Sequence, residues 1–212
     1  MADPTDMLRF TLNGRPVAVP RPVRGHLADL LRGHFGLTGT HLGCEHGVCG
    51  ACNLRVDGAV VRGCLMLAEQ ADGAEVQTVE GLTEDGTLAA LQAAFAARGA
   101  AQCGFCTPGM LLTAQELLAQ VPRPGRQAIR AAISGNFCRC TGYEAIVDAI
   151  DAVAGGRAPD VPRAEGIGSP LPRPASLRAA RGAGCYTGDI APAGLLHVAF
   201  LRSPYAHARI TV

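Results

Sequence analysis

The chain has 212 residues, enough for one large domain or two small ones. Its 19 basic residues, all arginine, nearly balance 18 acidic residues, so the net charge of +1 creates no strong field toward nucleic acid or a membrane surface. Because the sequence contains no lysine, a lysine-dependent phosphate loop and Schiff-base chemistry are both excluded.

Neither membrane insertion nor export is expected. No apolar run approaches the roughly 18 residues that a membrane span needs, and residues 1–6 are acidic rather than apolar, unlike a signal peptide. We therefore predict a cytoplasmic location. In that reducing compartment thiolates hold metal more often than they form disulfides, so the nine cysteines become the most informative feature.

Residues 1–80 are predicted to form a small α+β domain with its helix packed across a mixed sheet. In chain order the expected elements are a hairpin at 7–19 around Asn13-Gly14, a helix at 27–35, two strands around Asp57-Gly58 and a strand at 75–79. A cysteine-bearing loop at 43–52 separates the helix from the next strands. Ferredoxins of the plant type are built in this way.

Residues 81–155 are predicted to form a four-helix bundle, because apolar residues here recur at helical spacing. The helices are expected at 88–99, at 107–120 with Pro108 in its first turn, around 129–133 and at 146–153. Residues 156–175 contain five prolines and three glycines and are predicted to be a linker. Residues 176–212 return to an ordered pattern, with strands expected at 195–201 and 209–212.

Four cysteines in the first domain share the spacing C-x4-C-x2-C-x11-C. They are Cys44, Cys49, Cys52 and Cys64. The spacing of the first three cysteines matches the plant-type [2Fe–2S] spacing, and Gly43, Gly47 and Gly50 allow the backbone to wrap a cluster closely. Structural zinc also takes four thiolates, but zinc sites usually pair two C-x2-C knuckles, which this run does not provide.

Four more cysteines form a second set in the helical segment. They are Cys103, Cys106, Cys138 and Cys140, in two pairs that each stand just before a predicted helix. Helix N-termini would favour an anionic cluster, yet on spacing alone zinc remains a serious alternative. Cys185 is left over and is expected to be a small buried apolar residue.

Three motifs together resemble the iron–sulfur subunit of the molybdenum hydroxylases, the xanthine oxidase, aldehyde oxidase and carbon monoxide dehydrogenase family. They are GCEHGVCGAC at 43–52, QCGFCTPGM at 102–110 and GNFCRCTGY at 135–143. The resemblance covers about residues 7–155. It implies a β-grasp ferredoxin domain followed by a four-helix bundle, with a [2Fe–2S] cluster in each.

The same resemblance implies a place in an electron-transfer chain. The bundle cluster would lie next to a molybdopterin cofactor held by a molybdenum-binding large subunit, and Gln102 would contact the pterin. The other cluster would pass electrons outward to an FAD-binding medium subunit, a cytochrome or another acceptor. Substrate chemistry would not reside on this chain, which carries no catalytic residue of the family.

The C-terminal segment resembles the opening of the molybdenum-binding subunit, part of an α/β hammerhead domain. The matching stretches are YTGDI at 186–190 and LLHVAFLRSPYAHARI at 195–210. We therefore expect residues 176–212 to be a partial hammerhead segment that a partner completes. Two other hypotheses remain: a free-standing two-cluster electron carrier or redox sensor, and a zinc-stabilised interaction module.

Overall fold

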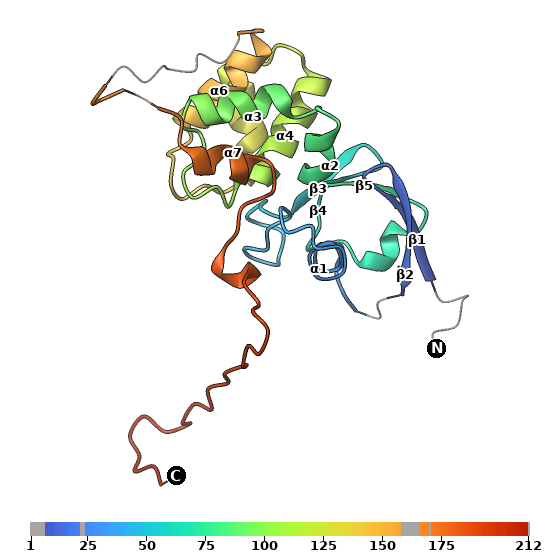
Figure 1. The fold of residues 1–212 in the computed structure, drawn as a ribbon, viewed down its shortest axis with the longest axis vertical. Coiled ribbons are helices and arrows are strands. Elements are labelled where there is room, and N and C mark those ends of the chain that lie inside the picture. Colours follow the sequence, from blue (N-terminus) through green and yellow to red (C-terminus); the bar gives the residue numbers. More distant parts are fainter. Residues whose placement is uncertain (1–6, 22–23, 158–165, 170, 212) are drawn as a thin grey trace.

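The computed structural model describes residues 7–21, 24–157, 166–169 and 171–211. Figure 1 shows a sheet region at residues 7–77, a helical region beside it, and a C-terminal segment that crosses the helical region and then leads away. No helix in the described ranges is long and apolar enough to cross a bilayer.

The sheet region is a five-stranded mixed sheet with the strand order β2-β1-β5-β3-β4. Its elements are β1 Met7–Leu12, β2 Arg15–Pro20, α1 Leu27–Gly33, β3 Asn53–Val56, β4 Ala59–Arg62, a 3-10 turn at Ala68–Ala71 and β5 Glu75–Gln77. The chain reverses through Asn13-Gly14 and through Asp57-Gly58, all four with positive φ, as two-residue hairpin turns require. Only β1 and β5 pair in parallel.

Alternation along β1 explains how this sheet builds its core. Leu8, Phe10 and Leu12 are buried on one face, and Leu27 and Leu31 of α1 are buried in the same hydrophobic cluster. Successive side chains of a strand point to opposite faces, so the buried face of β1 contributes to the same core as α1. The predicted α+β class is confirmed for this region.

The helical region places a helix at each of the four predicted positions. The elements are α2 Val79–Glu84, α3 Ala89–Ala97, α4 Thr107–Gln120, α5 Arg126–Ala132, a 3-10 turn at Ile133–Gly135 and α6 Glu144–Ala154. Met110, Leu111 and Leu112 of α4 are fully buried in a core that is continuous with that of the sheet region. The short helix α2 was not predicted, because six residues provide less than two turns of periodicity.

The structure corrects the prediction for the C-terminal third in two places. A further helix, α7 Pro174–Ala180, begins inside the predicted linker and packs on α3 and α4. A 3-10 turn follows at Thr187–Asp189. The strands predicted at 195–201 and 209–212 are absent through residue 211; Val212 and linker residues 158–165 and 170 lie outside the described ranges. An alternating apolar pattern becomes a strand only when a second strand satisfies its backbone groups.

Candidate metal centres

The first cysteine set lies on the loop between α1 and β3 and on the turn after β4. Cys44 and Cys49 are partly exposed on the loop, whereas Cys52 and Cys64 are buried. The Cys49 N–H donates to the Cys44 Sγ over 3.4 Å, and the Cys52 and Cys64 thiols contact each other. The first and last of these cysteines are 20 residues apart in sequence, and the structure brings all four thiols together.

The backbone of this loop favours thiolate at one position. N–H groups of His46, Cys49 and Val48 point at Cys44 and lower its thiol pKa to about 6. Burial acts in the opposite direction at Cys52 and raises its thiol pKa to about 11. A bound cation that receives thiolate electron density would offset that burial cost, so the donor set suits a metal centre.

The second set lies at the edge of the helical region. Cys106 directly precedes α4 and Cys103 stands three residues earlier, while Cys138 and Cys140 lie on the loop before α6. The Sγ atoms of Cys103 and Cys140 are 3.5 Å apart, and Cys106 interacts with Cys138. Cys103 and Cys140 are exposed, whereas Cys106 and Cys138 are partly buried.

Charge stabilisation differs among these thiols. Burial raises the pKa of Cys106 and of Cys103. At Cys138 burial is outweighed by hydrogen bonds from the Thr141 hydroxyl, 3.1 Å from its Sγ, and from backbone N–H groups of Cys140 and Thr141, so its pKa is lowered. We expected the N-termini of two helices to lie beside this set. α4 begins directly after Cys106, as expected. α6 begins only at Glu144, and the Thr141 hydroxyl lies beside the Cys138 sulfur instead.

The eight thiols lie in four contacting pairs. The pairs are Cys44 with Cys49, Cys52 with Cys64, Cys103 with Cys140, and Cys106 with Cys138. Within the described ranges no three histidine, cysteine or acidic side chains converge as they would around a single ion. In a [2Fe–2S] cluster each iron takes two of the four thiolates, so two pairs in each set fit that group.

The two sets are joined across the boundary between the sheet and helical regions. The N–H of Phe137, which precedes Cys138, donates to the carbonyl oxygen of Cys49 over 2.8 Å. The buried Asn136 amide donates to the Gly50 carbonyl over 3.2 Å. Arg62 donates to the carbonyls of Gly135 at 2.7 Å and Gly47 at 3.2 Å. The loops that carry the two sets are therefore in direct hydrogen-bond contact.

Gly50 shows how close this approach is. Its φ is +71°, and a Cβ built there would lie 2.5 Å from the Gly135 carbonyl oxygen. The sequence predicted that Gly50 lets the loop wrap a cluster. Its second role, in the contact with the helical region, depends on Gly135, 85 positions away, and so was not predicted.

Two other candidate residues have different outcomes. Gln102 is exposed beside Cys103, and its backbone carbonyl accepts a hydrogen bond from Arg173 over 2.7 Å. Cys185 was expected to be buried, and this expectation was wrong: its thiol is exposed, because the segment that carries it lies on the surface of the helical region.

Sequence reasoning missed a cluster of aromatic side chains beside the second set. His41 stacks on Phe105 with ring centroids 4.6 Å apart, and Tyr186 meets both rings edge-on at 5.0 and 5.2 Å. These residues come from three separate segments, so no local pattern connects them. Phe105 stands between Cys103 and Cys106 within the motif at 102–110, which was the available hint.

Family models and known proteins match both regions. A 2Fe-2S iron-sulfur cluster binding domain matches residues 10–83, and a [2Fe-2S] binding domain matches residues 78–151. The chain is 52% identical over 149 residues to the nicotine 6-hydroxylase small subunit of Paenarthrobacter nicotinovorans, covering 69% of this chain and 90% of that protein. It is 42% identical over 149 residues to the xanthine dehydrogenase iron-sulfur-binding subunit of Escherichia coli O157:H7, covering 69% and 92%.

A solved structure extends the similarity into the C-terminal segment. The aldehyde oxidoreductase of Desulfovibrio gigas superimposes with a TM-score of 0.77 and 38% identity, and the match covers 86% of this chain. It covers 22% of that much longer protein. The similarity therefore reaches beyond the two matched domains.

Proposed function

This chain belongs to the family of small iron–sulfur subunits of molybdenum hydroxylases and dehydrogenases, and from that membership we propose how its two cysteine sets work. Cys44, Cys49, Cys52 and Cys64 hold one [2Fe–2S] cluster. Cys103, Cys106, Cys138 and Cys140 hold the other. When bound, the clusters accept and pass on electrons one at a time. The observation that carries the proposal is the arrangement of eight thiols in four pairs, grouped as two sets of four.

We propose the order of the two sites from the exposure of the second set and from the family. Cys103, Cys140 and Gln102 all lie at the surface of the helical region. We place the molybdopterin of a molybdenum-binding large subunit against this surface, with Gln102 contacting the pterin. The Cys49 carbonyl and the Phe137 N–H link the inner edges of the two sets. Electrons leave from the first set to an FAD-binding medium subunit, a cytochrome or another acceptor.

The chain's own residues prepare each site in three ways. Backbone N–H groups stabilise thiolate at Cys44, and the Thr141 hydroxyl does so at Cys138. Burial of Cys52 and Cys64 excludes water from the inner side of the first set, which together with hydrogen bonds to sulfur governs a cluster's potential. Cytoplasmic placement, where thiols stay reduced until metal is inserted, completes the proposal.

Metal analysis of the chain purified without air tests the cluster assignment. Two clusters give about four irons per chain and a red-brown colour, since each contains two irons. Cys49→Ser and Cys106→Ser should each remove one cluster and leave about two irons. Stoichiometric zinc with no visible absorption would instead establish the structural-zinc alternative, and elution of the native chain without partners would favour a free-standing carrier.

A further inference from the structure

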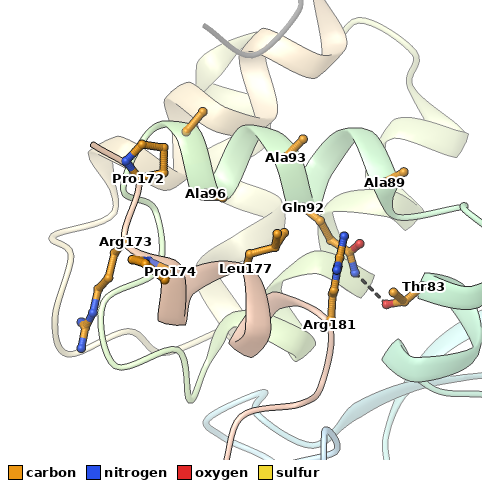
Figure 2. A pocket seen from close by; sticks show the side chains of 11 residues that line it. Thr83, Ala89, Gln92, Ala93, Ala96, Pro172, Arg173, Pro174, Leu177 and Arg181 are labelled. Atoms are coloured by element: carbon orange, nitrogen blue, oxygen red, sulfur yellow. Dashed lines mark hydrogen bonds between the residues drawn. The ribbon is translucent and has the colours of Figure 1, made fainter. Parts of the chain in front are cut away.

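The segment 173–189, here called the strap, is bound firmly to the helical region. Ser176 is buried on α7 and donates its hydroxyl to the Ala101 carbonyl over 2.8 Å. The buried Gln92 of α3 donates to the Ala180 carbonyl at 3.0 Å and to the Thr83 hydroxyl at 2.7 Å. In Figure 2 Leu177 points from α7 toward α3, beside a cavity of about 700 Å³ between the two helices.

The strap also contacts the loop that carries the second cysteine set. The Tyr186 hydroxyl donates to the Cys103 carbonyl over 2.9 Å. Its ring packs edge-on against Phe105, which lies between two proposed ligands. Gly104 has a φ of +82°, and a Cβ there would collide with Ala179 of α7. The strap and this loop are therefore in close contact at both ends of the Cys103–Phe105 turn.

An ion pair anchors the far end of the strap to the sheet region. Asp189 pairs with Arg32 of α1, and the two side chains are only 8% and 20% exposed. Arg32 also donates to the carbonyls of Thr38 at 2.7 Å and Thr40 at 3.1 Å. The other carboxylate oxygen of Asp189 accepts the Tyr186 N–H over 2.9 Å. One acidic side chain thus links the backbone of Tyr186 to α1.

The Cys103 turn has a conformation that these contacts can preserve. The Phe105 N–H points at the Cys103 sulfur, while the Cys103 carbonyl faces outward to the Tyr186 hydroxyl. Hydrogen bonds to cysteine sulfur favour the reduced, more negative cluster and so raise its potential. The Tyr186 hydroxyl bond holds the Cys103 carbonyl outward. It therefore keeps the turn in the conformation in which the Phe105 N–H points at the Cys103 sulfur.

We propose that Tyr186 is a positioning residue for the second cluster, acting through the Cys103 carbonyl, and that the strap holds it in place through Asp189 and α7. The proposal rests on the function proposed above, because it requires a cluster between Cys103, Cys106, Cys138 and Cys140. The Tyr186 hydroxyl bonds to the Cys103 carbonyl rather than to a ligand sulfur. It sets the backbone turn that carries one.

The Tyr186→Phe substitution removes the hydroxyl and keeps the ring, so it tests the hydrogen bond alone. In a redox titration of the iron-loaded chain monitored by electron paramagnetic resonance, we expect the second cluster to shift to a lower midpoint potential with altered g values. The first cluster serves as an internal reference and should not shift. Arg178→Gln, at an exposed position on the outer side of α7, is the matched control and should leave both potentials unchanged.

A second variant covers the possibility that Tyr186→Phe fails to hold either cluster. Asp189→Asn weakens the ion pair without touching the cysteine loop, and it should produce a shift of the same sign with faster hydrogen exchange at amides 102–106. An unshifted second cluster in both variants would overturn the role of Tyr186. Absence of a second [2Fe–2S] cluster from the unmodified chain would instead refute the proposed function, so the two failures are distinguishable.

Discussion

Gly50 occupies the point of closest approach between the loops of the two cysteine sets, and two separate constraints apply to it. Its φ of +71° disfavours any L side chain, and a Cβ would also meet the Gly135 carbonyl and the Asn136 amide. Gly58 has φ +84° but open space around it. Substitutions at these two positions therefore share the conformational strain, but only a substitution at Gly50 adds a steric collision.

We expect Gly50→Ala to destabilise the chain clearly more than Gly58→Ala does. The left-handed conformation alone costs roughly 1–2 kcal/mol in either variant. At Gly50 the displaced 135–137 segment should also lose its bonds to the Cys49 and Gly50 carbonyls and release iron from the second set. Denaturant unfolding and iron content measure both effects. Equal losses in the two variants would show that the contact does not constrain the loops.

His41 has a buried ring whose protonation should couple to stability. Its Nδ1 lies 2.6 Å from the Phe105 carbonyl oxygen, so Nδ1 carries the proton and donates. Its Nε2 is buried with no hydrogen-bond partner among the described residues. Burial lowers the pKa of His41, Arg32 lowers it further, and the Phe105 bond, Asp189 and Glu80 oppose this; the Tyr186 ring also faces the imidazole.

A lowered pKa in the folded state fixes the sign of the pH dependence. The folded state is favoured most where His41 is neutral, above the unfolded pKa of about 6.5. As pH falls below that value the unfolded state takes up the proton first, so the free energy of unfolding decreases by at most about 1.4 kcal/mol per pH unit. His41→Gln can keep a donor to Phe105 but cannot titrate. Urea unfolding at pH 7 and pH 5.5 should therefore show a smaller decrease in stability for the variant than for the unmodified chain, whereas parallel decreases would exclude His41 as the cause.

At this scale the sequence predicted the eight cysteines and their grouping, but not the residues around them. Cysteine spacing within a loop is a local feature, and metal chemistry limits which spacings work. The contacts of His41 with Phe105 and of Tyr186 with Cys103 join residues 64 and 83 positions apart. Such pairs leave no trace in local periodicity. The exposed Cys185 was mispredicted for the same reason, because its burial depends on what the strap packs against.

Among the elements, the contact between β3, α4 and the 3-10 turn before Asn136 rests on a small polar network. The Asn53 side-chain amide donates to the Thr113 hydroxyl over 2.9 Å. That hydroxyl donates in turn to the side-chain oxygen Oδ1 of Asn136 over 3.0 Å. Asn136 donates in turn to Gly50. Asn53 and Asn136 are both buried, and buried polar groups that lose a partner are costly.

Asn136→Ala should therefore destabilise the chain by about 1–3 kcal/mol, since Thr113 and Gly50 each lose a bond in a buried setting. Ser134→Ala, two residues earlier, is the control: Ser134 is exposed and its hydroxyl reaches only the Ala131 carbonyl. Thermal unfolding of the two variants provides the comparison. If both behave like the unmodified chain, the network does not hold the two regions together.

Apolar residues at helical spacing predicted α3, α4, α5 and α6, and all four lie where that spacing placed them. The seven-residue α7 was not predicted, because the prolines at its start and just before it resemble a linker in composition. Its stability comes from Ser176, Ala179 and Ala180, which are buried against α3 and α4. Packing of this kind supplies most of the stability of short helices in proteins, and composition does not reveal it.

At the scale of the whole molecule, the stretch after the strap exposes a run of apolar side chains to solvent. Leu195, Leu196, Val198, Phe200 and Leu201 are all exposed, with Leu196 at 85% and Phe200 at 83%. Contiguous exposed apolar side chains mark interaction surfaces in soluble proteins. The aldehyde oxidoreductase that superimposes on this chain is a longer polypeptide, of which the match covers 22%.

We predict that residues 191–211 pair with the molybdenum-binding partner and complete a hammerhead-like domain with it, whereas the strap belongs to this chain. Two truncations separate these roles when each is co-expressed with the partner. Removing residues after Ile190 keeps Asp189 and its ion pair, so both clusters should remain at full iron content while recovery of the partner falls. Removing residues after Gly156 also deletes α7 and Tyr186, so the second cluster should in addition be lost or altered in its potential. Undiminished partner recovery with the shorter deletion would contradict the shared domain, because the exposed apolar side chains would then contribute nothing to assembly.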